Sequence, residues 1–253
     1  MKSTNIWKYI WVGTCLRFLQ DQKKGWKFHG DSYALGNINS FLEHLNNLGL
    51  HVTRRASYEL ETLRDEMSQQ PVDYLLTESD AERICKLADE IRLTFQAETQ
   101  GVFTYVVTDK RLDINKLLNH ADKLFSLSIY DACPEIARYD FNEAGKCIAF
   151  ERPTAAAFHI LRGTESVLRY YYKRYIRPAQ AGLTWGQMTH ALKNKSTGKK
   201  PEKLITNHLD HIREGFRNPT QHPDKIYSID EVQDLFGLCI DVVNRMIGAV
   251  SAK

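Results

Sequence analysis

The stretch from Gly215 to Asp224, GFRNPTQHPD, combines residue types that could act on a phosphate group. Arg217 and His222 have four residues between them, Asn218 follows the arginine directly, and two prolines stiffen the chain. An arginine offers a planar, permanently charged pair of donors that matches two phosphate oxygens and stabilises charge growing in a transition state. A histidine can take or give a proton near neutral pH. The pattern therefore predicts a site for phosphodiester chemistry.

RNA is the expected substrate because its 2′-hydroxyl is a nucleophile already present beside the phosphate. An arginine clamp and one acid/base group then suffice, without metal ion or cofactor, to leave a 2′,3′-cyclic phosphate and a 5′-hydroxyl. One histidine serves poorly both as base for the attack and as acid for the leaving group. Two copies of the corner, facing each other in a homodimer, would solve this problem. The histidines at 190, 208 and 211 and the scattered cysteines do not make a complete metal site.

A structural reading of the same residues stays open. Arg152 and His159 form a second pair with similar separation, so the spacing alone is weak. An arginine in the last turn of a helix can also simply complement the helix dipole. Glu165 favours the functional reading because helical periodicity places it on an apolar stripe, where a carboxylate needs a partner. Arg217 and His222 are the natural candidates for that partner.

The elements that must position these residues are helices. Apolar residues recur at helical spacing in four segments of the second half, which predicts a four-helix bundle. The expected helices cover residues 135–149, 153–175, 201–216 and 229–248. Ser228 followed by Glu231 is a capping-box pattern at the start of the last helix. The stretch GFRNPTQHPD is therefore expected at an ordered corner between the third and fourth helices.

The first half, residues 1–131, is expected to form a separate, mostly helical regulatory or sensor domain of unknown function. Its expected helices cover residues 34–48, 53–68 and 79–98. Residues 101–108, GVFTYVVT, are rich in β-branched and aromatic types and predict a strand, the small β element of a mainly α chain. The second domain is expected at 132–253, where Lys and Arg exceed Asp and Glu and favour a polyanionic partner.

The segment RNPTQH, placed after a third helix, resembles the RxxxxH signature of the HEPN superfamily, in which Asn, Asp or His commonly follows the arginine. The stretch EAGKCIAFERPTAAAFHILRGTESVLRYYYKRY is similar to the first two helices of bacterial HEPN-domain proteins, and the resemblance covers residues 132–250. It implies a metal-independent, dimeric endoribonuclease of toxin–antitoxin, abortive-infection or phage-defence systems, with Arg217 and His222 catalytic and Asn218 supporting. Other members lack activity and bind nucleotides, RNA or proteins, so a non-catalytic module is the alternative.

Four further residues are expected to contact RNA. Lys199 and Lys200 belong to a lysine-rich loop, and Arg162 and Arg169 share the polar face of the helix at 153–175. Cations in such places can follow a phosphate backbone, although a solvated loop and a solvated helix face are the simpler readings.

Composition and the first residues bear on location. The chain has 253 residues with 43% hydrophobic and 26% charged types and a net charge of +3, which is typical of a soluble protein. The apolar stretch at 1–20 is interrupted by Lys8 and Arg17 and lacks a cleavage site. We therefore expect a cytoplasmic protein without a membrane segment.

Overall fold

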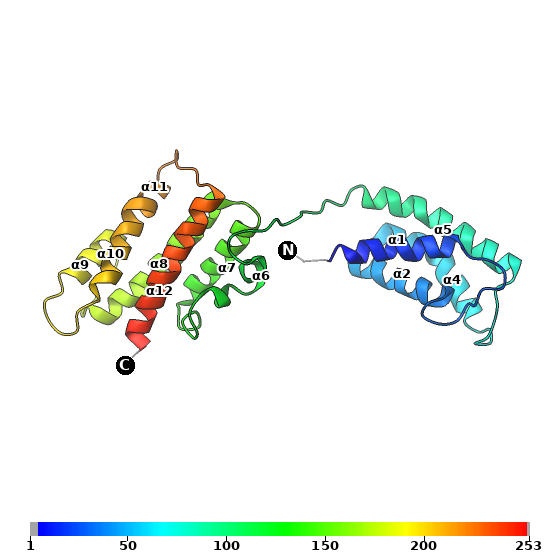
Figure 1. Cartoon of the computed structure of the whole chain (residues 1–253), viewed down its shortest axis with the longest axis horizontal. Coiled ribbons are helices and arrows are strands. Elements are labelled where there is room, and N and C mark those ends of the chain that lie inside the picture. Colours follow the sequence, from blue (N-terminus) through cyan, green and yellow to red (C-terminus); the bar gives the residue numbers. More distant parts are fainter. Residues whose placement is uncertain (1–4, 252–253) are drawn as a thin grey trace. The chain divides into compact units, whose positions relative to one another are not determined.

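The structure is a computed structural model and describes residues 5–251. Its secondary structure is almost wholly helical, which confirms the expected mainly α fold (Figure 1). The chain divides into two compact units, Met1–Tyr105 and Val106–Lys253. This division falls earlier than the expected boundary after residue 131. Residues 106–131 belong to the second unit because side chains such as Leu117 and Phe125 enter its core.

The first unit is a helical bundle with one apolar core. Its helices are α1 (Trp7–Gln20), α2 (Ala34–Leu48), α3 (His51–Ala56), α4 (Tyr58–Met67) and α5 (Glu78–Thr99). Helix α1 packs against α2 and α5, and Phe41 and Leu45 of α2 are fully buried. Gly49, with a φ of 73°, ends α2 in the left-handed conformation that favours glycine. Thr77 and Asp80 form a capping box at the start of α5.

The strand expected at 101–108 does not form. Within residues 5–251 the recorded β pairing is one isolated antiparallel bridge between Lys27 and Leu75. The β-prone side chains of 101–108 have no second strand beside them, and Phe103 and Tyr105 are exposed. A segment with strand propensity forms a strand only when a partner satisfies its backbone groups, so the prediction of a small β element here is wrong.

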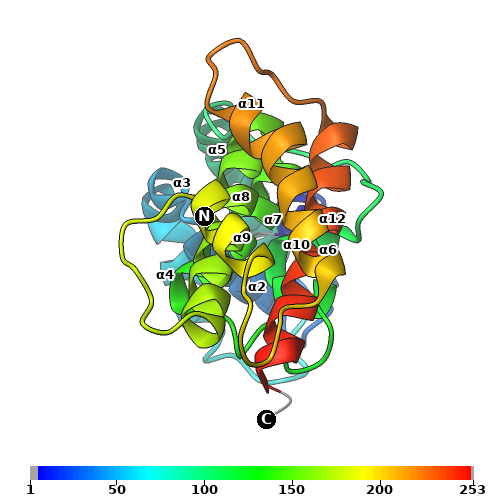
Figure 2. The same ribbon diagram turned by 90° about the vertical axis from the view of Figure 1, so that its left-hand side faces the viewer.

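The second unit contains the expected bundle with additional short elements. They are α6 (Ile114–Asn119), the 3₁₀ turn η1 (Ala121–Leu124), α7 (Glu135–Ala149), α8 (Pro153–Tyr175), α9 (Trp185–Lys193), α10 (Lys203–Ile212), the π turn η2 (Arg213–Arg217), α11 (Asn218–Thr220) and α12 (Ile229–Ser251). Helix α8 packs against α7, α12 and α9 and forms the centre of the unit (Figures 1 and 2). The position of each candidate-site side chain is therefore described by where it lies relative to α8.

Helix α9 was not expected from periodicity. Its first residue, Trp185, is almost fully buried, and the indole Nε1–H donates a hydrogen bond to the backbone oxygen of Leu209, 3.0 Å away. A capping box formed by Thr184 and Gln187 opens the helix. That Thr-x-x-Gln pattern was the sequence signal that could have revealed it.

Close packing of α7 on α8 requires a glycine. A Cβ at Gly163 of α8 would lie 2.9 Å from Cε1 of Phe141 and 3.1 Å from Cβ of Asp140, both on α7. The missing side chain lets the two helices approach closely enough for Asp140 to be fully buried between them.

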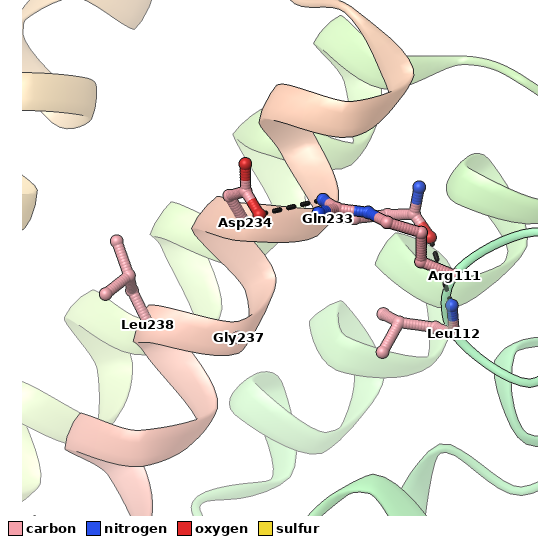
Figure 3. A pocket seen from close by; sticks show the side chains of 6 residues that line it. All are labelled: Arg111, Leu112, Gln233, Asp234, Gly237 and Leu238. Atoms are coloured by element: carbon pink, nitrogen blue, oxygen red, sulfur yellow. Dashed lines mark hydrogen bonds and ion pairs between the residues drawn. The ribbon is translucent and has the colours of Figure 1, made fainter.

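The segment before α6 is attached along α12 (Figure 3). Arg111 donates from Nη2 to Oδ1 of Asp234 at 2.8 Å, and the backbone N–H of Leu112 donates to Oε1 of Gln233 at 3.1 Å. These side chains line a shallow, mainly apolar pocket. The two hydrogen bonds hold the segment on the helix.

Candidate functional site

The corner between α10 and α12 is partly helical. Helix α10 ends at Ile212, earlier than the expected end at residue 216, and continues through the π turn η2 into the short helix α11. Arg217 is the last residue of η2, and Asn218 and Pro219 begin α11. A π turn widens the helix locally and is frequent at functional sites.

Buried hydroxyl groups fix the corner. The backbone oxygen of Phe216 accepts hydrogen bonds from Oγ1 of Thr220 at 2.7 Å and from the hydroxyl of Tyr227 at 3.1 Å. The backbone N–H of Tyr227 donates to Oγ1 of Thr154, which lies in the first turn of α8. Burial raises the pKa of Tyr227, so its hydroxyl stays protonated and able to donate. The corner is therefore tied to the start of α8.

The expected capping box follows the corner. The backbone N–H of Glu231 donates to Oγ of Ser228 at 3.1 Å, and the carboxylate of Glu231 accepts from the N–H of Ser228 at 3.3 Å. Lys225 pairs with the same carboxylate, and this hydrogen bond is the main cause that lowers the pKa of Glu231. The prediction of a capping box at this position is confirmed.

Glu165 of α8 meets two arginines. Its side chain is 20% exposed, so it is partly buried rather than fully enclosed. Oε1 accepts a hydrogen bond from Nη2 of Arg169 at 2.5 Å, and Oε2 lies 3.7 Å from Nη2 of Arg217. Of the two partners expected for Glu165, Arg217 is the one that the structure places beside it. The longer distance makes this an ion pair without a hydrogen bond, which leaves the guanidinium donors of Arg217 available.

Asn218 and His222 are exposed on the same turn as Arg217. The backbone N–H of His222 donates to the oxygen of Pro219 at 2.9 Å. Within the described part of the chain, its imidazole takes part in no recorded hydrogen bond or ion pair. The corner thus presents a loosely paired guanidinium and a free imidazole from a backbone that buried groups hold in place.

A second polar cluster, which sequence reasoning missed, lies between α7 and α8. Asp140 of α7 is fully buried, and its carboxylate accepts from His159 Nδ1 at 2.9 Å and from Arg162 Nε at 2.8 Å and Nη2 at 2.5 Å. Asp140 occupies the apolar face of α7, three residues after the buried Ala137. The argument that singled out Glu165, a carboxylate on an apolar stripe, would have found Asp140 as well.

Lys199 and Lys200 lie away from the corner. Lys199 lines a pocket with Arg174 and Lys195 near the C-terminal ends of α8 and α12, whereas the corner is tied to the first turn of α8. Figure 2 shows the turn after α11 and the loop after α9 at opposite ends of the second unit. Lys195 donates to the backbone oxygen of Tyr175 at 2.6 Å, and such cations complement helix C-termini. The structure therefore does not bring the two loop lysines to Arg217.

Comparisons of the chain with protein-family models, curated proteins and solved structures find no match. Among the helices that the structure describes, none combines the length and apolar character needed to cross a membrane. Within residues 5–251, no three side chains of His, Cys, Asp or Glu lie together as ligands for a metal ion. What can be inferred about function comes from the chemistry of the corner and of α8.

Proposed function

We propose that the chain is a metal-independent endoribonuclease of the HEPN type, with Arg217 and His222 as its catalytic residues. The observation that carries the proposal is the corner itself, where a loosely paired arginine and a free histidine share one turn fixed by buried hydroxyl groups. Such a turn supports the proposal because it leaves both side chains free of hydrogen bonds to other side chains, and catalysis by positioning needs free groups on a fixed backbone.

The reaction needs a nucleophile, a charge clamp and two proton transfers. The 2′-oxygen of RNA attacks the neighbouring phosphorus while its proton passes to a base. The bond from phosphorus to the 5′-oxygen breaks, and an acid protonates that oxygen, which leaves a 2′,3′-cyclic phosphate and a 5′-hydroxyl. Arg217 stabilises the charge on the non-bridging oxygens, His222 transfers one proton, and Asn218 adds an amide donor. In a homodimer, His222 of the second copy supplies the other proton transfer.

Cleavage of single-stranded RNA in the presence of EDTA tests this proposal. Arg217→Ala and His222→Ala should each reduce the cleavage rate at least about a hundredfold, and the parent should leave cyclic-phosphate ends. Arg174→Ala and His190→Ala are matched controls because both residues are exposed and belong to other parts of the second unit. If the corner variants cleave RNA as fast as the parent, the assigned site is wrong.

A non-catalytic module that binds a nucleotide, RNA or a protein is the second candidate. The ion pair between Glu165 and Arg217 favours it, because a purely structural arginine would make the same contact. Size-exclusion chromatography separates the two candidates cheaply, since a strict monomer counts against a composite site.

We extend the proposal to a role in toxin–antitoxin or phage-defence systems. Induced expression of the parent in a bacterium should then arrest growth, and His222→Ala should relieve the arrest. Equal toxicity of parent and variant would contradict a catalytic role in the cell.

A further inference from the structure

The carboxylate of Asp140 fixes two partly exposed side chains of α8 in defined orientations. Both of its oxygens accept hydrogen bonds from Arg162, and Oδ1 also contacts Nδ1 of His159. Because Asp140 is 0% exposed, water does not compete for these bonds. His159 and Arg162 are three residues apart and lie on the same side of the helix. The arrangement resembles the way in which a buried carboxylate orients a functional imidazole.

Each of the two side chains keeps polar atoms free for a ligand. Since Nδ1 of His159 faces Asp140, Nε2 lies on the opposite side of the ring, and no described residue forms a hydrogen bond with it. Arg162 uses Nε and one side of Nη2 for Asp140, which leaves Nη1 free on a side chain that is 61% exposed. A structural ion pair alone does not require the imidazole or the second amino group of the guanidinium to face solvent.

The exposed side of α8 connects this cluster to the corner. Phe158, Arg162, Glu165 and Arg169 follow one another at helical spacing, and Glu165 reaches Arg217. Arg162, Arg169 and Arg217 outnumber the two carboxylates that they contact, so this side of the helix attracts anions. Phe158 is half exposed among these charges, although a phenyl ring is normally buried.

Exposed aromatic rings between cations are the recurring means of binding single-stranded nucleic acids. The cations contact backbone phosphates, and bases stack on the rings without sequence preference. Tyr139 of α7 is also more than half exposed and directs its ring toward that of His159, with centroids 6.4 Å apart. The cluster thus offers the two kinds of contact that a nucleotide needs.

We propose that Asp140, His159 and Arg162 form a phosphate-binding site for the strand of RNA that leads to the corner. This inference rests on the proposed function and deepens it. Arg162 Nη1 donates to an oxygen of a phosphate next to the one that is cleaved, and His159 presents its free Nε2 to the same nucleotide. Phe158 carries a neighbouring base. Asp140 is a positioning residue that acts through the other two.

The test measures RNA affinity in the full-length His222→Ala chain, so that binding is read without cleavage. A fluorescent single-stranded RNA is titrated in EDTA at several salt concentrations, with His159→Gln, Arg162→Gln and Asp140→Asn added singly. Arg162→Gln should weaken binding roughly five- to tenfold and reduce the slope of log Kd against log salt by about 1. Lys123→Gln is the charge-matched control because η1 packs against α6 and α7 rather than α8. Thermal unfolding of each variant confirms that it is folded.

The outcomes separate this site from the proposed catalytic corner. If His159→Gln and Arg162→Gln both kept the RNA affinity and salt slope of the His222→Ala chain to which they are added, the phosphate site would be overturned. This holds whether or not cleavage depends on His222. Weakened binding by these variants would support it, even if the parent proved unable to cleave RNA. For Asp140→Asn, weaker binding with a smaller salt slope in a folded variant supports positioning, because loss of the negative charge alone would strengthen binding to RNA. If uridine monophosphate displaced the labelled RNA at concentrations as low as those at which the RNA binds, the site would bind free nucleotides. That result would overturn the assignment to a strand of RNA.

Discussion

Removing the partners of Asp140 should destabilise the second unit far more than removing Asp140 itself. In a His159→Ala/Arg162→Ala variant, Asp140, which is 0% exposed in the parent, loses every side-chain donor that the structure gives it. A buried charge stripped of its partners costs about 3–5 kcal/mol. Asp140→Ala instead leaves His159 and Arg162, which are partly exposed and become hydrated. Exchange of those hydrogen bonds for water costs only about 1–2 kcal/mol.

The triple variant that combines all three substitutions gives the decisive test, which is the sign of its stability difference from the double variant. It removes the stranded carboxylate, so it should be more stable than the double variant by about 2 kcal/mol, although it carries one more destabilising substitution. No additive account predicts such a gain. A matched control is the pair Glu143 and Lys146, which lies on the same helix at the surface. Its double alanine variant should change stability by less than about 1 kcal/mol.

Urea unfolding combined with hydrogen–deuterium exchange measures these differences. Exchange read on peptides from α7 and α8 reports the second unit alone, because the two units need not unfold together. A triple variant as unstable as the double variant, or less stable, would show that Asp140 is not an unsolvated charge. The carboxylate would then not depend on His159 and Arg162 for its stability in the core.

Three further predictions concern other parts of the molecule. Gly145→Ala places a Cβ 2.4 Å from a backbone oxygen of α6 and should lower the free energy of unfolding, measured with urea, by about 1–3 kcal/mol. Gly237→Ala in α12 meets nothing within 4 Å and should raise the free energy of unfolding by about 0.5–1 kcal/mol; equal effects would refute the packing argument. The hydrogen bond from Lys225 lowers the pKa of Glu231 below its ordinary 4.5, so the stability it contributes is present above pH 4.5 and is lost as pH falls through the lowered pKa. Urea midpoints measured against pH should therefore be flatter for Glu231→Gln, and an unchanged profile would contradict this. Burial raises the pKa of Cys133 to about 12, so mass spectrometry should find this thiol unmodified by iodoacetamide at pH 8 until the protein unfolds.

The sequence predicted most of the long helices because their periodicity spans several turns, but it missed α1, and the helix expected at 53–68 is divided into α3 and α4. The bounds expected for α2 and α8 agree with the structure, and Pro153 marks the start of α8 as a helix-opening residue should. The strand at 101–108 failed because strand formation depends on a partner elsewhere in the chain, which local propensity does not report. The boundary after residue 131 failed to match for a related reason, since the packing of 106–131 on the second unit is a tertiary property.

The candidate site shows the same division between local and tertiary information. Periodicity identified Glu165 as a carboxylate in need of a partner, and Arg217 proved to lie beside it. The same rule applied to α7 points to Asp140, but its donors His159 and Arg162 come from the next helix. Their pairing depends on the close approach at Gly163, which no sequence pattern shows. The spacing of Arg152 and His159 was an example of a chance pair. In the structure His159 instead shares the carboxylate of Asp140 with Arg162.

The residues that hold the backbone of the corner are different from the residues proposed to act on RNA, so the two roles can be tested separately. Tyr227 and Thr220 are buried and hold the backbone through the oxygen of Phe216. Arg217 contributes only a long ion pair to this framework, and the imidazole of His222 contributes no recorded hydrogen bond or ion pair within the described residues. Replacing Arg217 or His222 should therefore leave the fold unchanged, whereas Tyr227→Phe should loosen the turn that presents both. A loss of activity in Arg217→Ala or His222→Ala would then report on chemistry, because the groups that build the corner remain in place.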